Sequence, residues 1–402
     1  MSKASSPRSV AEHAAAVAAL LPPFPVVERP VADCRGLVLG ADVTSPVALP
    51  PFDNSAMDGY AVRAADVAAA AGAPVTLPVP EDIPAGRTDV VPLAPGTAHR
   101  IMTGAPVPPG ADTVVKVEDT DAGMPTVTVR VPAAAGTHIR RIGEDVAAGA
   151  TVLTAGTVLG PAHLGLAAAV GRATLPVHRP ARVLILSTGS ELVAPGTALL
   201  PGQIYESNSM LLAGAAAEIG AEPTVLRFVP DDVAEFTSAV AARAADVDLL
   251  VTSGGVSAGA YEVVKDALTG QGVEFLRVAV QPGGPQGCGR LGDLAVVTLP
   301  GNPVSAALSF EVFVRPALLA AMGHRVVSRP VATARSTTAL TSPAGRRQFR
   351  RGWYDAASGE VRLVGGPGSH LLASLAGSNC LIDVPEATTE IAAGAEVRVL
   401  LL

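Results

Sequence analysis

Three short apolar runs in the middle of the chain constrain its fold more than any other feature. Residues 183–186, 248–251 and 294–298 are each bounded by turn-forming residues and followed by helical sequence. Strands that are buried on both faces have such near-continuous apolar sequences, and helices cover both faces of a parallel sheet. Helix-like segments at 209–219 and 233–245 lie between the runs. The pattern therefore predicts an α/β domain with a mostly parallel sheet.

Each apolar run ends in a loop that is rich in glycine, serine or threonine. These loops span residues 187–190, 252–259 and 299–305. Ligands of open α/β sheets bind beyond the carboxyl ends of the strands, so we predict a binding site where the three loops meet. Glycine-rich backbone before a helix N-terminus suits an anion, although the second loop also fits an ordinary tight turn. In the third loop, Asn302 or Ser305 can instead cap the following helix.

The remaining sequence predicts further domains around this α/β region. Ser9 and Glu12 match a capping box, and Pro22 ends the amphipathic helix that follows them. Short alternating runs separated by proline and glycine predict β-rich structure on both sides of the α/β region. The predicted division is a helical linking domain at 1–45 and 132–178, a β-rich domain at 46–131, an α/β domain at 179–326 and a β-rich domain at 327–402.

Composition argues against several classes of partner and location. The formal net charge is −7 and no basic run occurs, so duplex nucleic acid is a poor candidate ligand. Cys34, Cys288 and Cys380 form no metal-spaced cluster and fit a reducing compartment. Neither a signal peptide nor an uninterrupted apolar run of about 18 residues is found, so we expect a cytoplasmic protein without a membrane span.

The segment at residues 51–62 concentrates oxygen-bearing side chains. Asp53 and Asp58 flank Asn54 and Ser55. Such a set suits Mg²⁺, which takes one or two carboxylates and keeps water and phosphate oxygens as its other ligands. The same residue types favour turns, so a plain turn is the alternative for this segment taken alone.

The string PFDNSAMDGYAV at 51–62 resembles the signature of the molybdopterin molybdenumtransferases, the MoeA/gephyrin-type family that inserts molybdenum into molybdopterin. The resemblance runs from about residue 10 to the end of the chain. Its other strings occur in the family's order at 101–106, 140–145, 187–192, 202–208, 252–259 and 299–305. Chance agreement at so many ordered strings is implausible.

The resemblance implies both architecture and chemistry. It implies a helical linking part, a β-rich insertion, a pterin-binding α/β domain and a C-terminal β barrel, assembled as a homodimer with an active site shared across subunits. The implied substrates are adenylylated molybdopterin and molybdate. Molybdate is inserted at the dithiolene and AMP is released, with assistance from Mg²⁺. Handover of the pterin from the adenylylating protein is also implied.

Site residues follow from the positions that match the family's motifs. The implied catalytic residues are Asp58, Thr103, Asp145, Glu191 and Arg351. Asp58 and Glu191 are also the candidate metal ligands. For Asp145 taken alone, a solvated acid or a helix cap is the favoured interpretation. The residues implied to hold pterin and phosphate are Thr188, Gly189, Ser207, Asn208, Ser253, Gly254, Gly255, Ser257, Pro300, Gly301, Asn302, Pro303 and Ser369.

Four arginines lie within six residues near the C-terminus, and guanidinium groups suit phosphate and molybdate. Strand alternation places Arg347 and Arg351 on one face and Arg346 and Arg350 on the other. Only one pair can then face a site, and we expect the other pair to be solvated. The resemblance favours Arg351, with Ser369 nearby, as the anion ligands.

The chain also departs from the family pattern. Gln281 and Gly284 stand where the family's Lys-Pro-Gly-Lys-Pro loop has two lysines beside molybdate, and Ala260 stands where many members have Asp. Fewer cations should weaken anion capture, or move that work to Arg351 or Arg290. The alternative to an insertase is therefore a pterin-binding carrier or scaffold with reduced insertase activity. The adenylylating step ranks third, because it does not need the β-rich insertion or the barrel.

Overall fold

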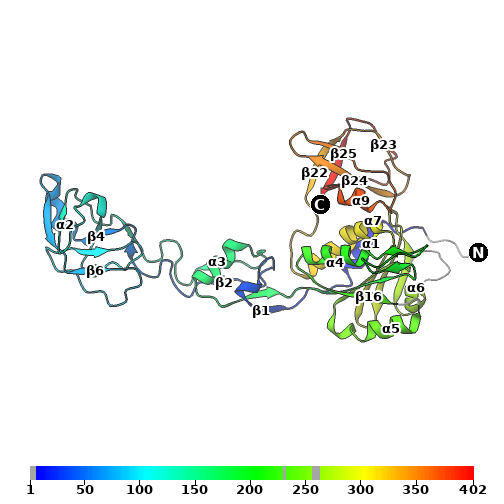
Figure 1. Ribbon diagram of the computed structural model, residues 1–402, viewed down its shortest axis with the longest axis horizontal. Coiled ribbons are helices and arrows are strands. Elements are labelled where there is room, and N and C mark those ends of the chain that lie inside the picture. The colour runs from blue at the N-terminus through cyan, green and yellow to red at the C-terminus, as the bar shows by residue number, and fades with distance from the viewer. Residues whose placement is uncertain (1–5, 230–231, 256–262) are drawn as a thin grey trace, which may run out of the picture. The chain divides into compact units, whose positions relative to one another are not determined.

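The computed structural model describes residues 6–229, 232–255 and 263–402, and the chain forms two compact units (Figure 1). The first unit comprises Met1–Val27, Gly36–Gly40 and Pro176–Leu402. The second comprises Glu28–Arg35 and Ala41–Leu175. Each unit has hydrophobic cores of its own.

A six-stranded sheet forms the centre of the first unit. Its order is β16-β13-β17-β21-β20-β18, with parallel pairing from β16 to β21 and antiparallel pairing beyond. The strands are β13 (Arg182–Thr188), β16 (Glu222–Val229), β17 (Leu249–Ser253), β18 (Val273–Arg277), β20 (Pro285–Leu291) and β21 (Leu294–Leu299). The three apolar runs of the sequence are the adjacent strands β13, β17 and β21, so the predicted mostly parallel sheet is confirmed.

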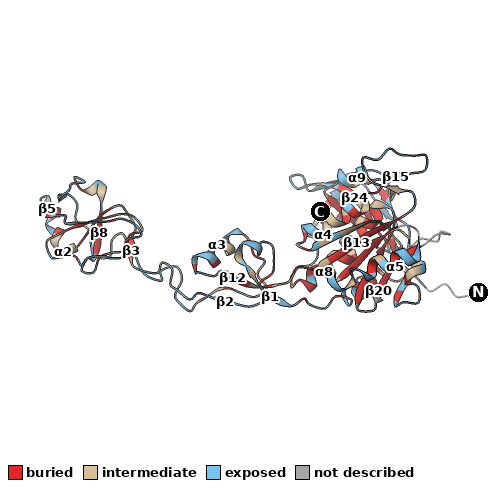
Figure 2. Cartoon of the chain, turned by 60° about the horizontal axis from the view of Figure 1, so that its bottom comes forward, coloured by how far each residue is buried: buried red, intermediate tan, exposed pale blue. Residues whose placement is uncertain are grey.

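Alternate residues of the central strands contribute to two separate cores. On β13, Val183 and Ile185 join one core, whereas Leu184 and Leu186 join the other. One face is covered by α1 (Val10–Ala18), α4 (Asn208–Glu218) and the helices that follow β21, and the other by α5 (Val233–Ala241) and α6 (Val263–Leu268). Figure 2 shows β13 as a buried strand. Burial of both faces explains why these strands lack polar alternation.

The longest helical stretch follows β21 and is continuous through three segments. They are α7 (Pro303–Ser309), the π-helical η5 (Phe310–Val314) and α8 (Arg315–Ala321). Among the described residues, the stretch Pro303–Ala321 alone has the length and apolar composition of a membrane span, but 67% of its most apolar window is buried inside the protein. That burial is typical of a core helix.

The C-terminal residues close into a β barrel. Strand β24 pairs with both β25 and β26, and β22 and β28 complete the circle in the order β24-β25-β22-β28-β26. The elements are β22 (Val331–Ser336), β23 (Leu340–Thr341), β24 (Arg347–Asp355), β25 (Glu360–Leu363), α9 (Leu372–Ala376), β26 (Cys380–Val384), β27 (Glu390–Ile391) and β28 (Glu396–Leu401). Strand β19 (Val280–Gln281) leaves the α/β domain and pairs with the start of β24. The barrel implied by the resemblance is therefore present.

The second unit is rich in short strands. Its four-stranded sheet has the order β6-β7-β4-β8, and the remaining strands form pairs. The strands are β2 (Val43–Thr44), β3 (Asn54–Ser55), β4 (Gly59–Val62), β5 (Val75–Pro78), β6 (Glu81–Ile83), β7 (His99–Ile101), β8 (Thr113–Lys116), β9 (Thr126–Val129), β10 (Ile139–Arg140) and β11 (Thr151–Leu153). Tyr60 is fully buried at the centre of its core.

The expected helical linking region differs from the structure. Helix α1 has its predicted capping box, since Ser9 Oγ accepts from Glu12 N at 3.2 Å and Glu12 accepts from Ser9 N at 2.9 Å. It packs against η5 and α8 in the first unit. Residues 132–178 contain α3 (Pro161–Ala169) with strands β10, β11 and β12 (Thr174–His178) around it. Left-handed glycines such as Gly143 and Gly149 end turns there, so a high alanine content does not produce a long helix.

Candidate functional site

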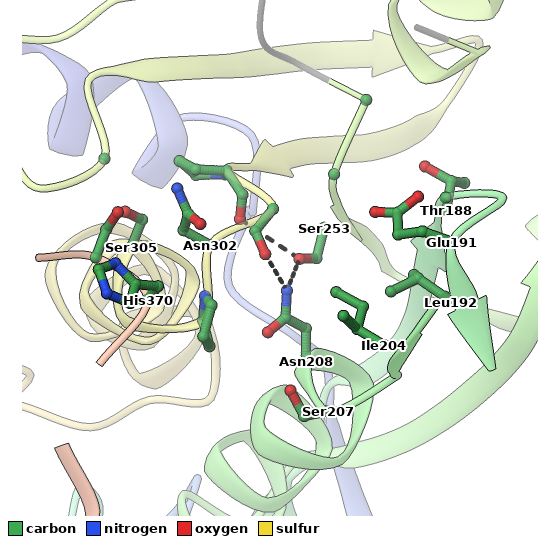
Figure 3. A pocket seen from close by; sticks show the side chains of 18 of the residues that line it. Thr188, Glu191, Leu192, Ile204, Ser207, Asn208, Ser253, Asn302, Ser305 and His370 are labelled. Atoms are coloured by element: carbon green, nitrogen blue, oxygen red, sulfur yellow. Dashed lines mark hydrogen bonds between the residues drawn. The ribbon is translucent and has the colours of Figure 1, made fainter. Parts of the chain in front are cut away.

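A cavity of about 1010 Å³ lies beyond the carboxyl ends of β13, β17 and β21 (Figure 3). Its walls come from the loops after these strands, from the start of α4, and from a barrel loop. The described lining residues fall at 188–192, 204–208, 253–255, 281–283, 285, 300–303, 305 and 367–370, with Val263. The three loops that the sequence predicted to converge therefore share one cavity.

One amide side chain ties two of these loops to the start of α4. Asn208, at the start of α4, donates from Nδ2 to Ser253 Oγ and to the carbonyl oxygen of Gly301, both at 2.7 Å. Ser253 Oγ in turn donates to the carbonyl oxygen of Pro300 at 3.4 Å. Figure 3 shows this network in the middle of the cavity wall. Because Ser253 is only 2% exposed, the network holds the loops as one preformed surface.

The loop after β17 depends on glycine. Gly254 has a φ of +95°, and a Cβ at this position would lie 2.7 Å from the carbonyl oxygen of Thr188. Its backbone N–H donates to the carbonyl oxygen of Leu299 at 3.1 Å. A side chain here would therefore separate the β13 and β17 loops, which are in contact only because residue 254 is a glycine.

The cavity gathers most of the residues that the resemblance assigned to pterin and phosphate. The lining includes Thr188, Gly189, Ser207, Asn208, Ser253, Gly254, Gly255, Pro300, Gly301, Asn302, Pro303 and Ser369, together with Glu191. Ser257 and Ala260 lie outside the described residues. The sequence did not single out Glu206 or His370, which also line the cavity. Both belong to strings that it did use, since Glu206 lies within 202–208 and His370 follows Ser369 directly.

The described walls of the cavity carry few charges. They contain the carboxylates of Glu191 and Glu206 and the imidazole of His370, but neither lysine nor arginine. Glu206 is 8% exposed and accepts from the N–H of Ser209 at 2.8 Å, so it caps α4. Glu191 is exposed, and Figure 3 shows its carboxylate beside Thr188. Electrostatically, the wall is neutral to acidic.

Arg351 lies in a second, smaller cavity of about 360 Å³, between α4, α7 and the barrel. It is 3% exposed and donates from Nη2 to the carbonyl oxygen of Gly366, while its Nε has no partner among the described residues. Burial, and secondarily the charge of Arg350, lowers the pKa of Arg351. Pro282 lines both cavities. Arg290 instead donates to the carbonyl oxygens of Asp293 and Leu20, and it lines neither cavity.

The other arginines of this cluster have separate roles. Arg347 makes two hydrogen bonds of 2.7 Å to Asp383, and Arg346 is exposed. The expectation that Arg350 is solvated is wrong, because it is half-buried and burial lowers the pKa of its guanidinium. Arg350 pairs in register with Ile382, whose side chain belongs to the barrel core. Its position therefore faces the barrel interior.

The segment at residues 51–62, which contains Asp53 and Asp58 and is called the acidic segment below, lies in the second unit. Asp58 directly precedes β4, and its Oδ1 accepts from the backbone N–H of Thr103 at 2.6 Å, so the structure brings these two predicted residues together. That hydrogen bond lowers the pKa of Asp58, which is exposed. Asp53 is already engaged, since it accepts from Ile142 N at 2.8 Å and from Arg141 Nη1 at 2.6 Å.

Asp145 also lies in this unit, with its backbone N–H donating to the carbonyl oxygen of Leu49 at 2.9 Å and its side chain exposed. Over the described ranges, no group of three or more His, Cys, Asp or Glu residues is placed to hold a metal ion. A cation bound here would therefore need ligands beyond the protein, as Mg²⁺ commonly does.

Known protein families match almost all of the chain. Residues 8–171 match the family described as "MoeA N-terminal region (domain I and II)", residues 184–320 match "Probable molybdopterin binding domain", and residues 333–402 match "MoeA C-terminal region (domain IV)". Most of the large cavity's lining lies within the second match. The fold and the cavity thus define a multidomain protein of the MoeA class.

Individual relatives agree over the full length. Molybdopterin molybdenumtransferase 2 of Mycobacterium tuberculosis is 55% identical over 400 residues, covering 98% of this chain and 99% of the relative. Molybdopterin molybdenumtransferase of Haemophilus influenzae is 37% identical and covers 90% of each chain. The crystal structure of the molybdopterin biosynthesis MoeA protein from Pyrococcus horikosii has a TM-score of 0.82 and 30% identity, covering 98% of this chain and 99% of that one. The chain belongs to the molybdopterin molybdenumtransferase family.

Proposed function

We propose that this protein is an enzyme of molybdenum cofactor biosynthesis that inserts molybdate into molybdopterin. The observation that carries the proposal is the large cavity, which combines convergent strand-end loops with the residues that the family motifs assign to pterin and phosphate. Its volume of about 1010 Å³ suits a large, polar ligand, since small-molecule sites typically enclose roughly 300–1,000 Å³.

The protein's own contribution begins with binding and orientation. Asn208 and Ser253 hold the loops after β17 and β21 against the start of α4, so the cavity needs little rearrangement when the ligand enters. Hydroxyl, amide and backbone groups predominate over charged groups in the wall. Such neutral groups can fix the orientation of a pterin ring and a phosphate chain by hydrogen bonds. We infer that the substrate is the adenylylated form and that AMP leaves.

Asp58 and Glu191 are the residues that we propose for Mg²⁺. Their oxygen donors suit this ion, and the hydrogen bond from Thr103 occupies Oδ1 of Asp58 while it keeps the carboxylate ionised. Glu191 is exposed at the cavity. When bound, Mg²⁺ would offset the negative charge of phosphate oxygens. The two carboxylates belong to different units of the chain.

The setting of the reaction follows from the resemblance. We infer a homodimer whose active site is shared across subunits, a cytoplasmic location, and receipt of the pterin from the adenylylating protein. Asp145 and Arg351 remain predicted catalytic residues on the same basis. The net charge of −7 argues against a nucleic-acid partner.

A reconstituted insertion assay tests the proposal. Purified protein is mixed with adenylylated molybdopterin, Mg²⁺ and graded molybdate, and both AMP release and active cofactor are measured. Molybdate-dependent turnover that Asp58→Ala abolishes is the expected result. Tight pterin binding without turnover at any molybdate concentration would exclude the insertase.

One observation favours a second function, that of a pterin carrier or scaffold with reduced insertase activity. Neither lysine nor arginine lines the cavity among the described residues, and Gln281 lies where the family has a lysine. The insertion assay separates the two functions, because a carrier retains pterin without releasing AMP.

A further inference from the structure

The described walls of the large cavity carry little positive charge for a site that holds anions. Molybdate and phosphate are both negative, yet the described walls contain Glu191 and Glu206 and no lysine or arginine. The neighbouring sequence VSAGAYE at 256–262 contains no basic residue either. A single basic side chain, His370, is found among the described lining residues.

The position of His370 suits an anion. Figure 3 shows its imidazole beside Ser305, on the side of the cavity away from Thr188 and Glu191. A Cβ on residue 368 would lie 2.9 Å from Cε1 of His370, so the glycine there lets the ring lie along its own loop. The residue is exposed, and within the described chain its ring has no hydrogen-bond or ion-pair partner.

The elements around His370 contain no acidic side chain that could pair with its imidazole. Helix α7 has the sequence PVSAALS, helix α9 has LASLA, and residues 364–369 are VGGPGS, so none of them contains a titratable side chain. Arg351 has a defined contact to this loop, because it donates to the carbonyl oxygen of Gly366. The acids of the cavity, Glu191 and Glu206, lie on the β13 and α4 side.

We propose that protonated His370 binds an anionic group of the substrate, a molybdate or phosphate oxygen, at this end of the cavity. It thereby supplies part of the positive charge that the family's two lysines, replaced here by Gln281 and Gly284, supply in other members. The proposal rests on the proposed function, because it takes the cavity to be the substrate site.

The test is a calorimetric titration with sodium molybdate and, separately, with adenylylated molybdopterin. Four proteins are compared: the wild type, His370→Gln, His370→Lys and Arg362→Gln. Gln keeps a polar side chain without charge, and Lys keeps a positive charge. Arg362→Gln is the matched control, because it removes an exposed cation elsewhere on the barrel, where Arg362 lies over the Trp353 ring.

The expected result is a loss of affinity that a cation at residue 370 restores. Wild type and Arg362→Gln bind with equal affinity. His370→Gln binds about tenfold more weakly than wild type. His370→Lys recovers the affinity. Equal affinity in His370→Gln and wild type would overturn the proposal.

A second readout separates this proposal from the proposed function. In protein with isotope-labelled histidine, the ring signal that disappears in His370→Gln identifies His370 among the seven histidines. If molybdate shifts that signal while the insertion assay shows no turnover, the His370 proposal stands and the insertase proposal fails. If turnover is normal and the signal ignores molybdate, the His370 proposal fails alone. If neither responds, both fail.

Discussion

The cavity wall of the first unit and the acidic segment of the second unit differ in how far their polar side chains are buried and in what holds them. In the wall, buried groups such as Ser253 and Thr188, 2% and 7% exposed, are fixed at the carboxyl ends of strands β17 and β13. In the acidic segment, Asp58 is exposed, precedes the four-residue β4, and is fixed by a hydrogen bond from Thr103. The wall is therefore suited to shape-specific binding, whereas the acidic segment presents charge. Substitutions in the first should change affinity, and those in the second should change turnover.

The sharpest test of this difference is Asp58→Ala. We expect kcat to fall by about 100-fold or more, with the affinity for adenylylated molybdopterin within about threefold of wild type, because the charge is lost and the wall is intact. Asp58→Asn, which keeps the shape and can still accept from Thr103 N–H, should lose kcat nearly as severely. Steady-state kinetics measure kcat, and a binding titration measures the affinity for adenylylated molybdopterin. A weaker affinity with unchanged kcat would contradict the division of roles.

Gly254→Ala tests the wall in the converse way. The new Cβ would lie 2.7 Å from the carbonyl oxygen of Thr188, so the β13 and β17 loops must separate. We expect affinity for adenylylated molybdopterin to fall about tenfold or more. Gly270→Ala is the matched control, because it has a similar left-handed φ of +76° but nothing within 4 Å of its Cβ. Equal affinities in the two variants would show that the contact at Gly254 does not shape the site.

Asp248→Asn separates stability from binding, because Asp248 precedes β17 at the end opposite the cavity. Burial raises the pKa of Asp248, but hydrogen bonds from Arg179 and Arg182 outweigh it and lower this pKa to about 2. The folded pKa lies below the unfolded value of about 3.9, so the carboxylate's stabilisation is present above about pH 4 and is lost as pH falls through about 2.

We expect Asp248→Asn to lower the free energy of unfolding by about 2–3 kcal/mol near neutral pH. The difference from wild type should vanish toward pH 2, while pterin affinity at neutral pH stays unchanged. Urea denaturation at several pH values measures the free energy of unfolding of both proteins and shows where their difference disappears. Equal stability of the two proteins at neutral pH would show that the ion pairs contribute nothing net.

The smallest expected effect is at His13 in α1, also remote from the cavity lining. His13 is fully buried, meets the Phe313 ring edge-on at 4.7 Å, and has no partner for either ring nitrogen among the described residues. Burial, with the charge of Arg8, lowers its pKa to about 4. Protonation therefore favours the unfolded chain, and wild-type stability falls as pH drops from about 6.5 toward 4.

His13→Leu should remove this fall in stability between about pH 6.5 and 4, referred to below as the slope. It should change the free energy of unfolding near neutral pH by less than about 1.5 kcal/mol, because an apolar side chain of similar size replaces an unpaired polar ring. Urea denaturation near pH 7 and near pH 5 measures the slope. Retention of the wild-type slope in His13→Leu would show that another group causes it.

Much of the fold and of the cavity was predictable because its signals are local. An apolar run bounded by turn residues defines a strand buried on both faces, and the loops that follow parallel neighbours must meet at one edge of the sheet. Ser9 and Glu12 defined the start of α1 in the same local way. The grouping of residues 132–178 with the N-terminal residues 1–45 stays a prediction, because alanine content carries little information about which elements pack together.

The charged groups were harder to place. Sequence alone determined that loops with neutral hydrogen-bonding groups would converge, and that Asp58 would lie in an oxygen-rich turn region. Only the tertiary structure decided that Arg351 lines a second cavity, that Arg350 faces the barrel core, and that His370 enters the large cavity. The reason is that these positions depend on barrel closure and strand register. A shift of one residue in register sends every side chain of a strand to the opposite face, and short sequence patterns do not encode that choice.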